Sequence, residues 1–204
     1  MKRLGILGGT FNPIHKGHLA LAKAARKKFL LDKVIFIPTG TPPHKPHVGI
    51  VDKKHRYKMV ILATQNSPYF SVSRLEMDRP GVSYAVDTFR ILQKKFGKKA
   101  KLFYIMGLDS INEILEWRQP LELFKLCEII VGTRPGSKLQ TFKRLLKTPP
   151  LQAEAKKIHL LELKQAVSSS QIRLWLKDGK SVRRFLPKVV TDYISQSHLY
   201  QGNN

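Results

Sequence analysis

The residues best suited to chemistry lie in one short segment that begins with two glycines and ends in two histidines. Residues 8–18 read Gly-Gly-Thr-Phe-Asn-Pro-Ile-His-Lys-Gly-His. Gly8 and Gly9 allow backbone N–H groups to approach an anion closely. His15 and His18 are three residues apart, so if both lie in one helical turn they share a face, and both imidazoles can donate to phosphoryl oxygens. This pattern indicates electrostatic stabilisation of a phosphate group during its transfer.

Two other readings of the histidine pair remain open. Histidines at this spacing also bind zinc, although residues 8–18 contain no cysteine or carboxylate that could complete a tetrahedral set. A histidine at this place can also simply cap a helix. The Gly-Gly pair does not distinguish among phosphate contact, zinc binding and helix capping, because it occurs in many tight turns between a strand and a helix.

The position of the segment favours phosphate chemistry. It follows an expected strand at 4–7 and precedes an expected helix at 18–29. In an open parallel sheet, ligands bind outside the carboxyl ends of the strands. The positive end of the following helix adds to the attraction for an anion. An ATP triphosphate would suit this place.

The surrounding pattern predicts an α/β fold: a doubly wound, Rossmann-like parallel sheet with helices on both faces. Short apolar runs alternate with segments of helical period, and nearly every residue of the runs is apolar, as in strands buried on both sides. The expected strands are 4–7, 34–38, 69–73, 101–106, 129–131 and 158–161, and the expected helices are 18–29, 53–65, 84–96, a short one after Asp109, 170–177 and 187–197.

We expect one domain spanning residues 1–204, with a small helical part at about 165–204. The basic stretch 135–157 contains prolines and only partial periodicity, and we expect it to be an insertion over a site. The single cysteine, Cys127, lies in an apolar run and is expected to serve packing.

Charge is the extreme feature of the composition. The chain has 37 Lys and Arg against 14 Asp and Glu, a formal net charge of +23. Such a field attracts nucleotides and nucleic acids alike. The basic residues are spread along the chain, which argues against a dedicated nucleic-acid arm and makes nucleic acid an unlikely partner. A basic nucleic-acid-binding protein is nevertheless the alternative function from a different class.

Nothing in the sequence resembles a membrane segment or a secretion signal. No apolar run approaches the roughly 20 residues of a membrane helix. The first residues run into an expected strand instead of a signal-peptide core. We therefore expect a cytoplasmic protein with no membrane partner.

The segment 8–18, with its H-x-G-H ending, resembles the nucleotide-binding signature of the adenylyl- and cytidylyltransferase superfamily. Over nearly its full length the chain resembles the bacterial nicotinate-nucleotide adenylyltransferases of that superfamily. The resemblance implies that ATP and nicotinate mononucleotide are joined into deamido-NAD and pyrophosphate, with Mg²⁺ bound through the ATP phosphates and with no metal held by the protein. Another member, such as a phosphopantetheine adenylyltransferase, is the alternative within the superfamily. A homo-oligomer stays possible.

The resemblance also implies which residues contact ATP. Residues 167–173, Val-Ser-Ser-Ser-Gln-Ile-Arg, resemble the family motif I-S-S-T-x-I-R, and Pro42-Pro43-His44-Lys45 resembles the loop whose lysine reaches the triphosphate. The implied catalytic residues are His15, His18, Lys45 and Arg173. The implied ATP-binding residues are Gly8, Gly9, Thr10, Phe11, His15, His18, Ser168, Ser169, Ile172 and Arg173.

A second group would contact the mononucleotide. In the family, polar groups at a helix start, an aspartate and a tryptophan that stacks on the pyridine ring perform this task, and an arginine near Thr133-Arg134-Pro135-Gly136 approaches nucleotide. A tryptophan face attracts a pyridinium cation, although Trp117 and Asp109 could equally be a packing residue and a helix cap. The implied residues are Ser83, Tyr84, Thr88, Gly107, Asp109, Trp117 and Arg134.

Overall fold

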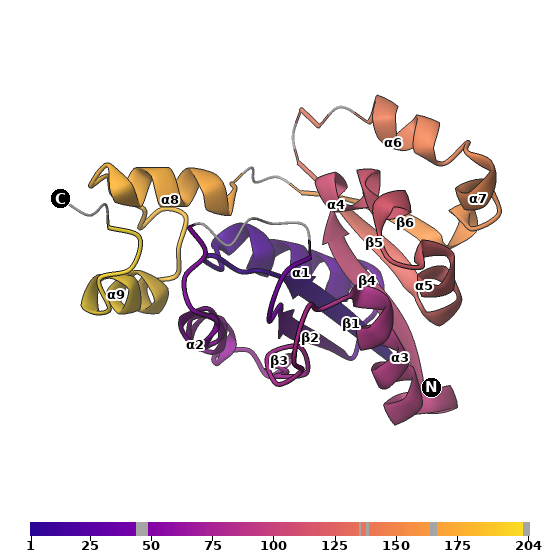
Figure 1. Cartoon of the computed structure of the whole chain (residues 1–204), viewed down its shortest axis with the longest axis horizontal. Coiled ribbons are helices and arrows are strands. Elements are labelled where there is room, and N and C mark those ends of the chain that lie inside the picture. Colours follow the sequence, from indigo (N-terminus) through magenta and orange to yellow (C-terminus); the bar gives the residue numbers. More distant parts are fainter. Residues whose placement is uncertain (44–48, 135, 138, 164–166, 202–204) are drawn as a thin grey trace.

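A six-stranded parallel sheet forms the centre of the molecule (Figure 1). The structure is a computed structural model, and it describes residues 1–43, 49–134, 136–137, 139–163 and 167–201. The strands are β1 (Lys2–Gly9), β2 (Lys33–Pro38), β3 (Phe70–Val72), β4 (Ala100–Gly107), β5 (Glu128–Thr133) and β6 (Ile158–Glu162). Their order is β3-β2-β1-β4-β5-β6. The chain therefore builds outward in one direction from β1 and then in the other, as in a doubly wound fold.

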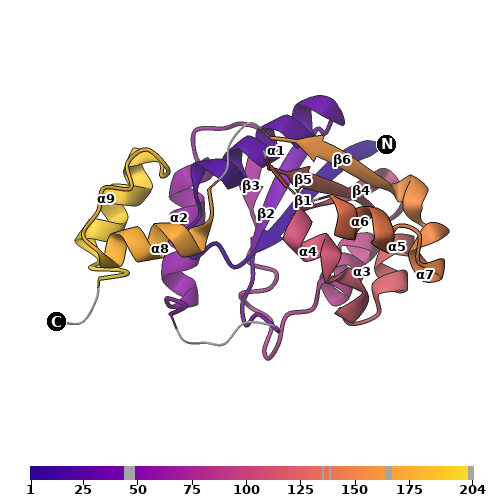
Figure 2. The same ribbon diagram turned by 90° about the horizontal axis from the view of Figure 1, so that it is seen from above.

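Helices cover both faces of the sheet, as predicted (Figure 2). One core contains residues of α1 (Lys16–Lys28), α2 (Lys53–Thr64), α8 (Ser169–Lys177) and α9 (Lys188–Gln196). The other contains residues of α3 (Ala85–Phe96), α4 (Leu108–Asn112), α5 (Pro120–Leu126), α6 (Gln140–Leu145) and α7 (Pro149–Gln152). Along β4, Phe103 and Ile105 enter the first core while Leu102, Tyr104 and Met106 enter the second, which is the alternation of a strand buried on both sides.

The outer strands depart from the predicted burial. All six expected strands are present, but the edge strand β6 has Leu160 36% exposed and Glu162 exposed. The opposite edge, β3, has three residues, of which only Phe70 is buried. An edge strand has a neighbour on one side only, so helices cover it less completely than the central strands.

The prediction that 135–157 is an insertion over a site is wrong for its described residues. These residues form the short helices α6 and α7, whose Phe142 and Leu151 are buried in the second core. The sequence also missed α5, which begins with Pro120 in its first turn. These three helices have four to seven residues, too few to show a helical period clearly.

The C-terminal helical part packs against the same core as the sheet. Ile172 of α8 and Val190 and Ile194 of α9 belong to one buried cluster with Leu7 of β1. This shared core supports our proposal that the chain forms one unit. In the described part of the chain, no helix has the length and apolar character needed to cross a membrane.

Candidate active site

The first loop, residues 10–15, starts where the strand order reverses. β1 and β4 are parallel neighbours, and their helices lie on opposite faces, α1 in the first core and α4 in the second. Such a divergence opens a crevice at the carboxyl ends of the two strands. Gly8 and Gly9 end β1, and Gly107 ends β4. The structure thus brings the segment that we expect to bind ATP and part of the expected mononucleotide group to one edge of the sheet.

The two histidines form a reciprocal cap at the start of α1. His15 is the N-cap residue, so it does not lie in the first turn, and the helix begins at Lys16, slightly earlier than predicted. The His18 backbone N–H donates to His15 Nδ1 (3.3 Å), and the His15 backbone N–H donates to His18 Nδ1 (3.2 Å). The two rings stack with centroids 3.7 Å apart. This arrangement fixes both imidazoles relative to the positive end of the helix.

The cap also decides where the imidazole protons lie. Because each Nδ1 accepts a hydrogen bond, each neutral ring carries its proton on Nε2. Burial, with a contribution from the charge of Arg134, lowers the pKa of His15 to about 3. His15 is therefore a neutral hydrogen-bond donor at physiological pH.

The depressed pKa of His15 predicts a loss of stability in acid. The unfolded chain takes up a proton at His15 below about 6.5, whereas the folded chain resists protonation down to about 3. Between these values protons favour the unfolded state, so stability falls with pH by up to about 1.4 kcal/mol per unit. Asparagine is a good N-cap without a titrating group. We expect the free energy of unfolding, measured in urea, to fall in both proteins as the pH is lowered from 6.5 to 5. The fall should be about 2 kcal/mol smaller in His15→Asn than in the unaltered protein. Equal losses would contradict the assignment, since all other groups titrate in both proteins.

Phe11 supports the histidines from the protein interior. Its backbone has a φ of 48°, a left-handed conformation that is unusual for a bulky residue, and its side chain is 2% exposed. The ring meets His18 edge to face, with centroids 5.1 Å apart. The expectation that Phe11 contacts ATP is thus limited to its backbone, because its ring is used to orient His18.

The start of α8 meets the first loop, as the two separate motifs predicted. Arg173 Nη1 donates to the backbone oxygen of Asn12 (2.8 Å), and Ser169 Oγ donates to that of Pro13 (3.0 Å). Ser168 caps α8 through a bond from Gln171 N to its Oγ (3.2 Å). Arg173 is partly exposed and keeps further N–H groups with which it can reach a phosphate.

Ile172 has a different role from the one expected. Its side chain is fully buried, and its N–H donates to the backbone oxygen of Ser168. The fold uses both groups, so Ile172 anchors α8 in the first core instead of contacting ATP.

Asn12 and Tyr200 are structural partners that sequence reasoning missed. Asn12 is 4% exposed, donates from Nδ2 to the Gly49 oxygen (2.8 Å) and accepts at Oδ1 from the Tyr200 hydroxyl (2.8 Å). Burial raises the pKa of Tyr200, so its hydroxyl stays protonated and donates. The C-terminal residues are in this way tied to the first loop. No sequence pattern marks a contact between residues 188 positions apart.

A buried polar network lies beneath Ser83 and Thr88. Thr88 is 2% exposed and its hydroxyl donates to Glu76 Oε1 (2.7 Å), so we assign Thr88 a positioning role instead of the expected contact with mononucleotide. Burial raises the pKa of Glu76, against the effects of the Thr88 bond and the Arg79 charge. Ser83 Oγ and two guanidinium nitrogens of Arg79, Nε and Nη1, are buried without a partner among the described residues. Unpaired polar groups beside an active-site edge are candidates for ligand contacts.

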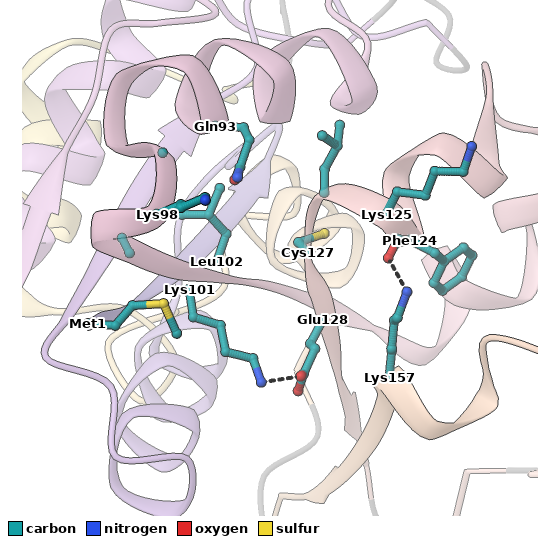
Figure 3. A pocket seen from close by; sticks show the side chains of 13 residues that line it. Met1, Gln93, Lys98, Lys101, Leu102, Phe124, Lys125, Cys127, Glu128 and Lys157 are labelled. Atoms are coloured by element: carbon teal, nitrogen blue, oxygen red, sulfur yellow. Dashed lines mark hydrogen bonds and ion pairs between the residues drawn. The ribbon is translucent and has the colours of Figure 1, made fainter.

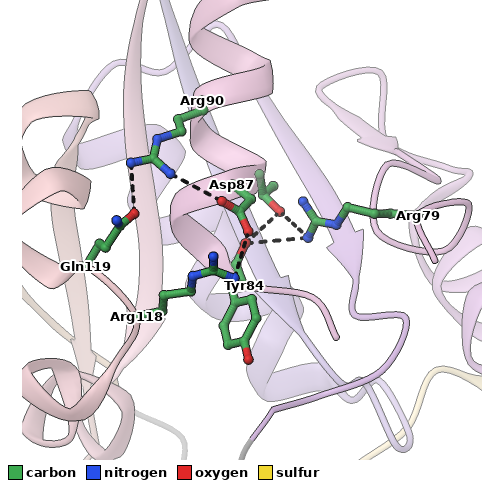
Figure 4. Close-up of polar contacts among 7 residues, drawn as sticks. Arg79, Tyr84, Asp87, Arg90, Arg118 and Gln119 are labelled. Atoms are coloured by element: carbon green, nitrogen blue, oxygen red, sulfur yellow. Dashed lines mark hydrogen bonds and ion pairs between the residues drawn. The ribbon is translucent and has the colours of Figure 1, made fainter. Parts of the chain in front are cut away.

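Tyr84 starts α3 on the same side (Figure 4). The guanidinium of Arg118 lies 4.7 Å from its ring centroid and 3.9 Å from Asp87. Arg90, one turn further along α3, donates to Gln119 Oε1 (2.8 Å). These contacts hold the 117–119 segment against α3.

Trp117 approaches the end of β1 through one intervening residue. Its ring lies 6.2 Å from that of Tyr104, centroid to centroid. The Tyr104 hydroxyl in turn lies so close to Gly8 that a Cβ there would be 3.2 Å from it. Trp117 is partly buried and Asp109, in the first turn of α4, is exposed. Both follow β4, and Asp109 lies next to its end.

Of the two remaining predicted cations, Arg134 and Lys45, the structure describes Arg134. Arg134 directly follows β5, is exposed, and its charge helps to lower the pKa of His15. That influence places Arg134 near His15. Lys45 lies outside the described residues.

A pocket of about 290 Å³ opens at the opposite end of the sheet (Figure 3). It is lined by the amino ends of β4 and β5, and it contains none of the predicted site residues. Two of its cations are used by the fold: Lys101 pairs with Glu128, and Lys157 donates to the Phe124 oxygen (3.0 Å). We therefore place the chemistry at the carboxyl end.

Comparisons with known proteins show the family of the chain. The family model described as Cytidylyltransferase-like matches residues 6–174. Proteins named probable nicotinate-nucleotide adenylyltransferase are 45% identical in Moorella thermoacetica and 44% identical in Thermoanaerobacter sp. strain X514. Each alignment spans 201 residues, which is 98% of this chain and 92% and 94% of the respective relative.

The fold is also that of a solved enzyme. The Plasmodium falciparum nicotinic acid mononucleotide adenylyltransferase complexed with NaAD superposes with a TM-score of 0.78 at 19% identity, covering 98% of both chains. The reversal of strand order at β1 and β4, the reciprocal histidine cap and the junction of α8 with the first loop thus occur in a chain whose full-length relatives share one name. The chain belongs to the cytidylyltransferase-like family and, within it, to the nicotinate-nucleotide adenylyltransferases.

Proposed function

We propose that this protein transfers the adenylyl group of ATP to nicotinate mononucleotide, giving deamido-NAD and pyrophosphate. The observation that carries the proposal is the histidine pair, which is fixed by a reciprocal cap at a helix N-terminus beside Arg173 and the first loop. Such a set stabilises charge on a phosphate group and supplies no covalent nucleophile. The full-length relatives support the choice of mononucleotide.

The chemistry needs positioning more than proton transfer. The 5′-phosphate of the mononucleotide attacks the α-phosphorus of ATP in line, a new P–O bond forms, and the bond to the pyrophosphate leaving group breaks. His18 donates its Nε2 proton as a hydrogen bond to the transferred phosphoryl group. Arg173 and Lys45 balance the charge on the β- and γ-phosphates, and Arg134 approaches the same site.

We propose that Mg²⁺ accompanies ATP, bound to phosphate oxygens and water. Among the described residues, no group of three or more His, Cys, Asp or Glu side chains could hold a metal ion. The donors at the site are imidazole, guanidinium and backbone N–H groups, which suit phosphate oxygens. Bound Mg²⁺ would neutralise charge on the triphosphate. Use of ATP also supports our proposal of a cytoplasmic location.

A pyrophosphate-release assay tests the function directly. Purified protein is incubated with ATP, Mg²⁺ and, in separate reactions, nicotinate mononucleotide, nicotinamide mononucleotide or phosphopantetheine. We expect the highest kcat/KM with nicotinate mononucleotide. Faster turnover of phosphopantetheine would replace the proposal with the other activity of the superfamily.

Trp117 provides a test of the mononucleotide side. An aromatic face contributes on the order of 1 kcal/mol to binding a pyridinium ring. We expect Trp117→Ala to raise the KM for the mononucleotide about tenfold and to leave the KM for ATP unchanged. Trp117→Phe retains an aromatic face and should recover most of the loss. Equal rises in both KM values would assign Trp117 to packing alone.

A further inference from the structure

Arg56 of α2 is a buried arginine that lies beneath two loops of the site. It is 2% exposed, the largest of the fully buried side chains. Its guanidinium donates to four backbone oxygens. These belong to Val51 (3.2 Å, from Nε), Thr10 (2.8 Å, from Nη1), Thr39 (2.7 Å, from Nη1) and Gly40 (2.9 Å, from Nη2).

The charge of Arg56 is not matched by a neighbouring carboxylate. Among the described residues, no Asp or Glu lies within 4 Å of its nitrogens. Burial lowers its pKa, while the more distant Asp52 and Tyr200 oppose that effect, and a guanidinium stays protonated in proteins. Carbonyl oxygens satisfy its hydrogen bonds but carry no net charge. A buried cation of this kind is costly unless something compensates for it.

The four contacts join the loops that follow two neighbouring strands. Thr10 belongs to the first loop after β1, and Thr39 and Gly40 start the second loop after β2, which leads toward Lys45. The second loop is held from its other side as well, because a Cβ on Gly40 would come within 2.3 Å of the Glu76 backbone oxygen. Arg56 thus fixes the separation of the two loops at Thr10, Thr39 and Gly40.

Peptide geometry gives these contacts a direction. In a trans peptide the C=O and the following N–H point opposite ways. Since the oxygens of Thr10 and Thr39 are drawn onto Arg56, the N–H groups of Phe11 and Gly40 are turned away from it. Backbone N–H groups oriented together in this way form anion sites.

We propose that Arg56 is a positioning residue for ATP, which turns amide N–H groups of both loops toward the triphosphate and adds a buried positive charge that the phosphates compensate. The inference rests on the proposed use of ATP and goes beyond the phosphate-contacting residues that the family motifs supply. On this proposal, a buried residue contributes to phosphate recognition.

Two variants of Arg56 and one control test the inference. Arg56→Lys keeps the charge but cannot reach four oxygens, and Arg56→Met removes the charge as well. Arg74→Met is the matched control, since Arg74 is exposed and pairs with Asp78 away from the site. We expect Arg56→Lys to raise the KM for ATP about tenfold, as the loss of one charge-assisted bond would, with the mononucleotide KM within twofold. Arg56→Met should raise it further, and Arg74→Met should not change it.

The split between the two KM values separates positioning from general support. An unchanged ATP KM in folded Arg56→Lys, or a proportional rise in both KM values together with a lower Tm, would overturn the proposal. If Arg56→Met does not fold, Arg56→Lys decides alone. Calorimetry with a non-hydrolysable ATP analogue gives the same comparison without turnover, so a wrong acceptor in the proposed function would not be mistaken for a failure of this inference.

Discussion

Replacing His18 with alanine is expected to lower kcat about a hundredfold, the usual effect of removing one preorganised donor from a developing charge. The variant loses the Nε2–H group that we place at the transferred phosphoryl. It also loses the Nδ1 acceptor for the His15 N–H (3.2 Å), which costs about 1 kcal/mol of stability. Steady-state kinetics with saturating ATP and nicotinate mononucleotide, together with a thermal melt, measures both effects.

His159→Ala is a matched control for this loss. His159, on the edge strand β6, forms a hydrogen bond between its Nε2 and Oε2 of Glu128 at the start of β5 (2.7 Å). Removing the His159 side chain therefore also costs one hydrogen bond, but at the amino end of β5. We expect a similar fall in Tm with kcat retained. Turnover within twofold of the unaltered protein in His18→Ala would remove the histidine pair from the mechanism.

The sheet was predictable because its central strands are buried on both faces. A strand such as 101–106 is apolar at almost every position, and this rarely occurs outside a sheet covered by helices on both sides. Longer helices such as α1 and α3 showed a helical period for a different reason, because only one face of each is buried. The short helices between 120 and 152 did not, because each contributes only one or two buried side chains, such as Phe142 and Leu151.

The site was predictable in its motifs and not in its internal supports. The sequence placed His18 and Arg173 in two motifs far apart in the chain, and the structure joins those motifs through the Asn12 oxygen. No sequence pattern pointed to Arg56 or Tyr200. Their partners are backbone or amide oxygens, and such oxygens occur in every sequence. The cap geometry of His15 was equally hidden, since the spacing of the pair is the same whether it lies in the first turn or just before it.

Gly17→Ala sets two opposing effects against each other at the centre of the H-x-G-H segment. Alanine is favoured over glycine inside a helix by about 1 kcal/mol. However, a Cβ on Gly17 would lie 2.9 Å from His15 Nδ1 and 2.9 Å from Val167 Cγ1, and overpacking of this kind costs about 1–3 kcal/mol. Both neighbours are held by other contacts, because His15 is buried and stacked on His18 and Val167 leads directly into the cap of α8. The added Cβ can therefore be accommodated only if one of these two residues shifts. The net change in stability should therefore be small.

Activity should fall far more than stability in Gly17→Ala, because the only atoms that can move are those that position the imidazoles and join α8 to the first loop. A displacement of about 1 Å is enough for a loss of about a hundredfold in kcat. Gly132→Ala is the control: its Cβ would lie 2.7 Å from Leu21 Cδ1 on the same helix, an equal crowding that does not touch the histidines. Kinetics and urea unfolding of the two variants should show comparable stability and a large difference in turnover. Full activity in Gly17→Ala would mean that α1 tolerates the shift, and the glycine would then be needed for packing alone.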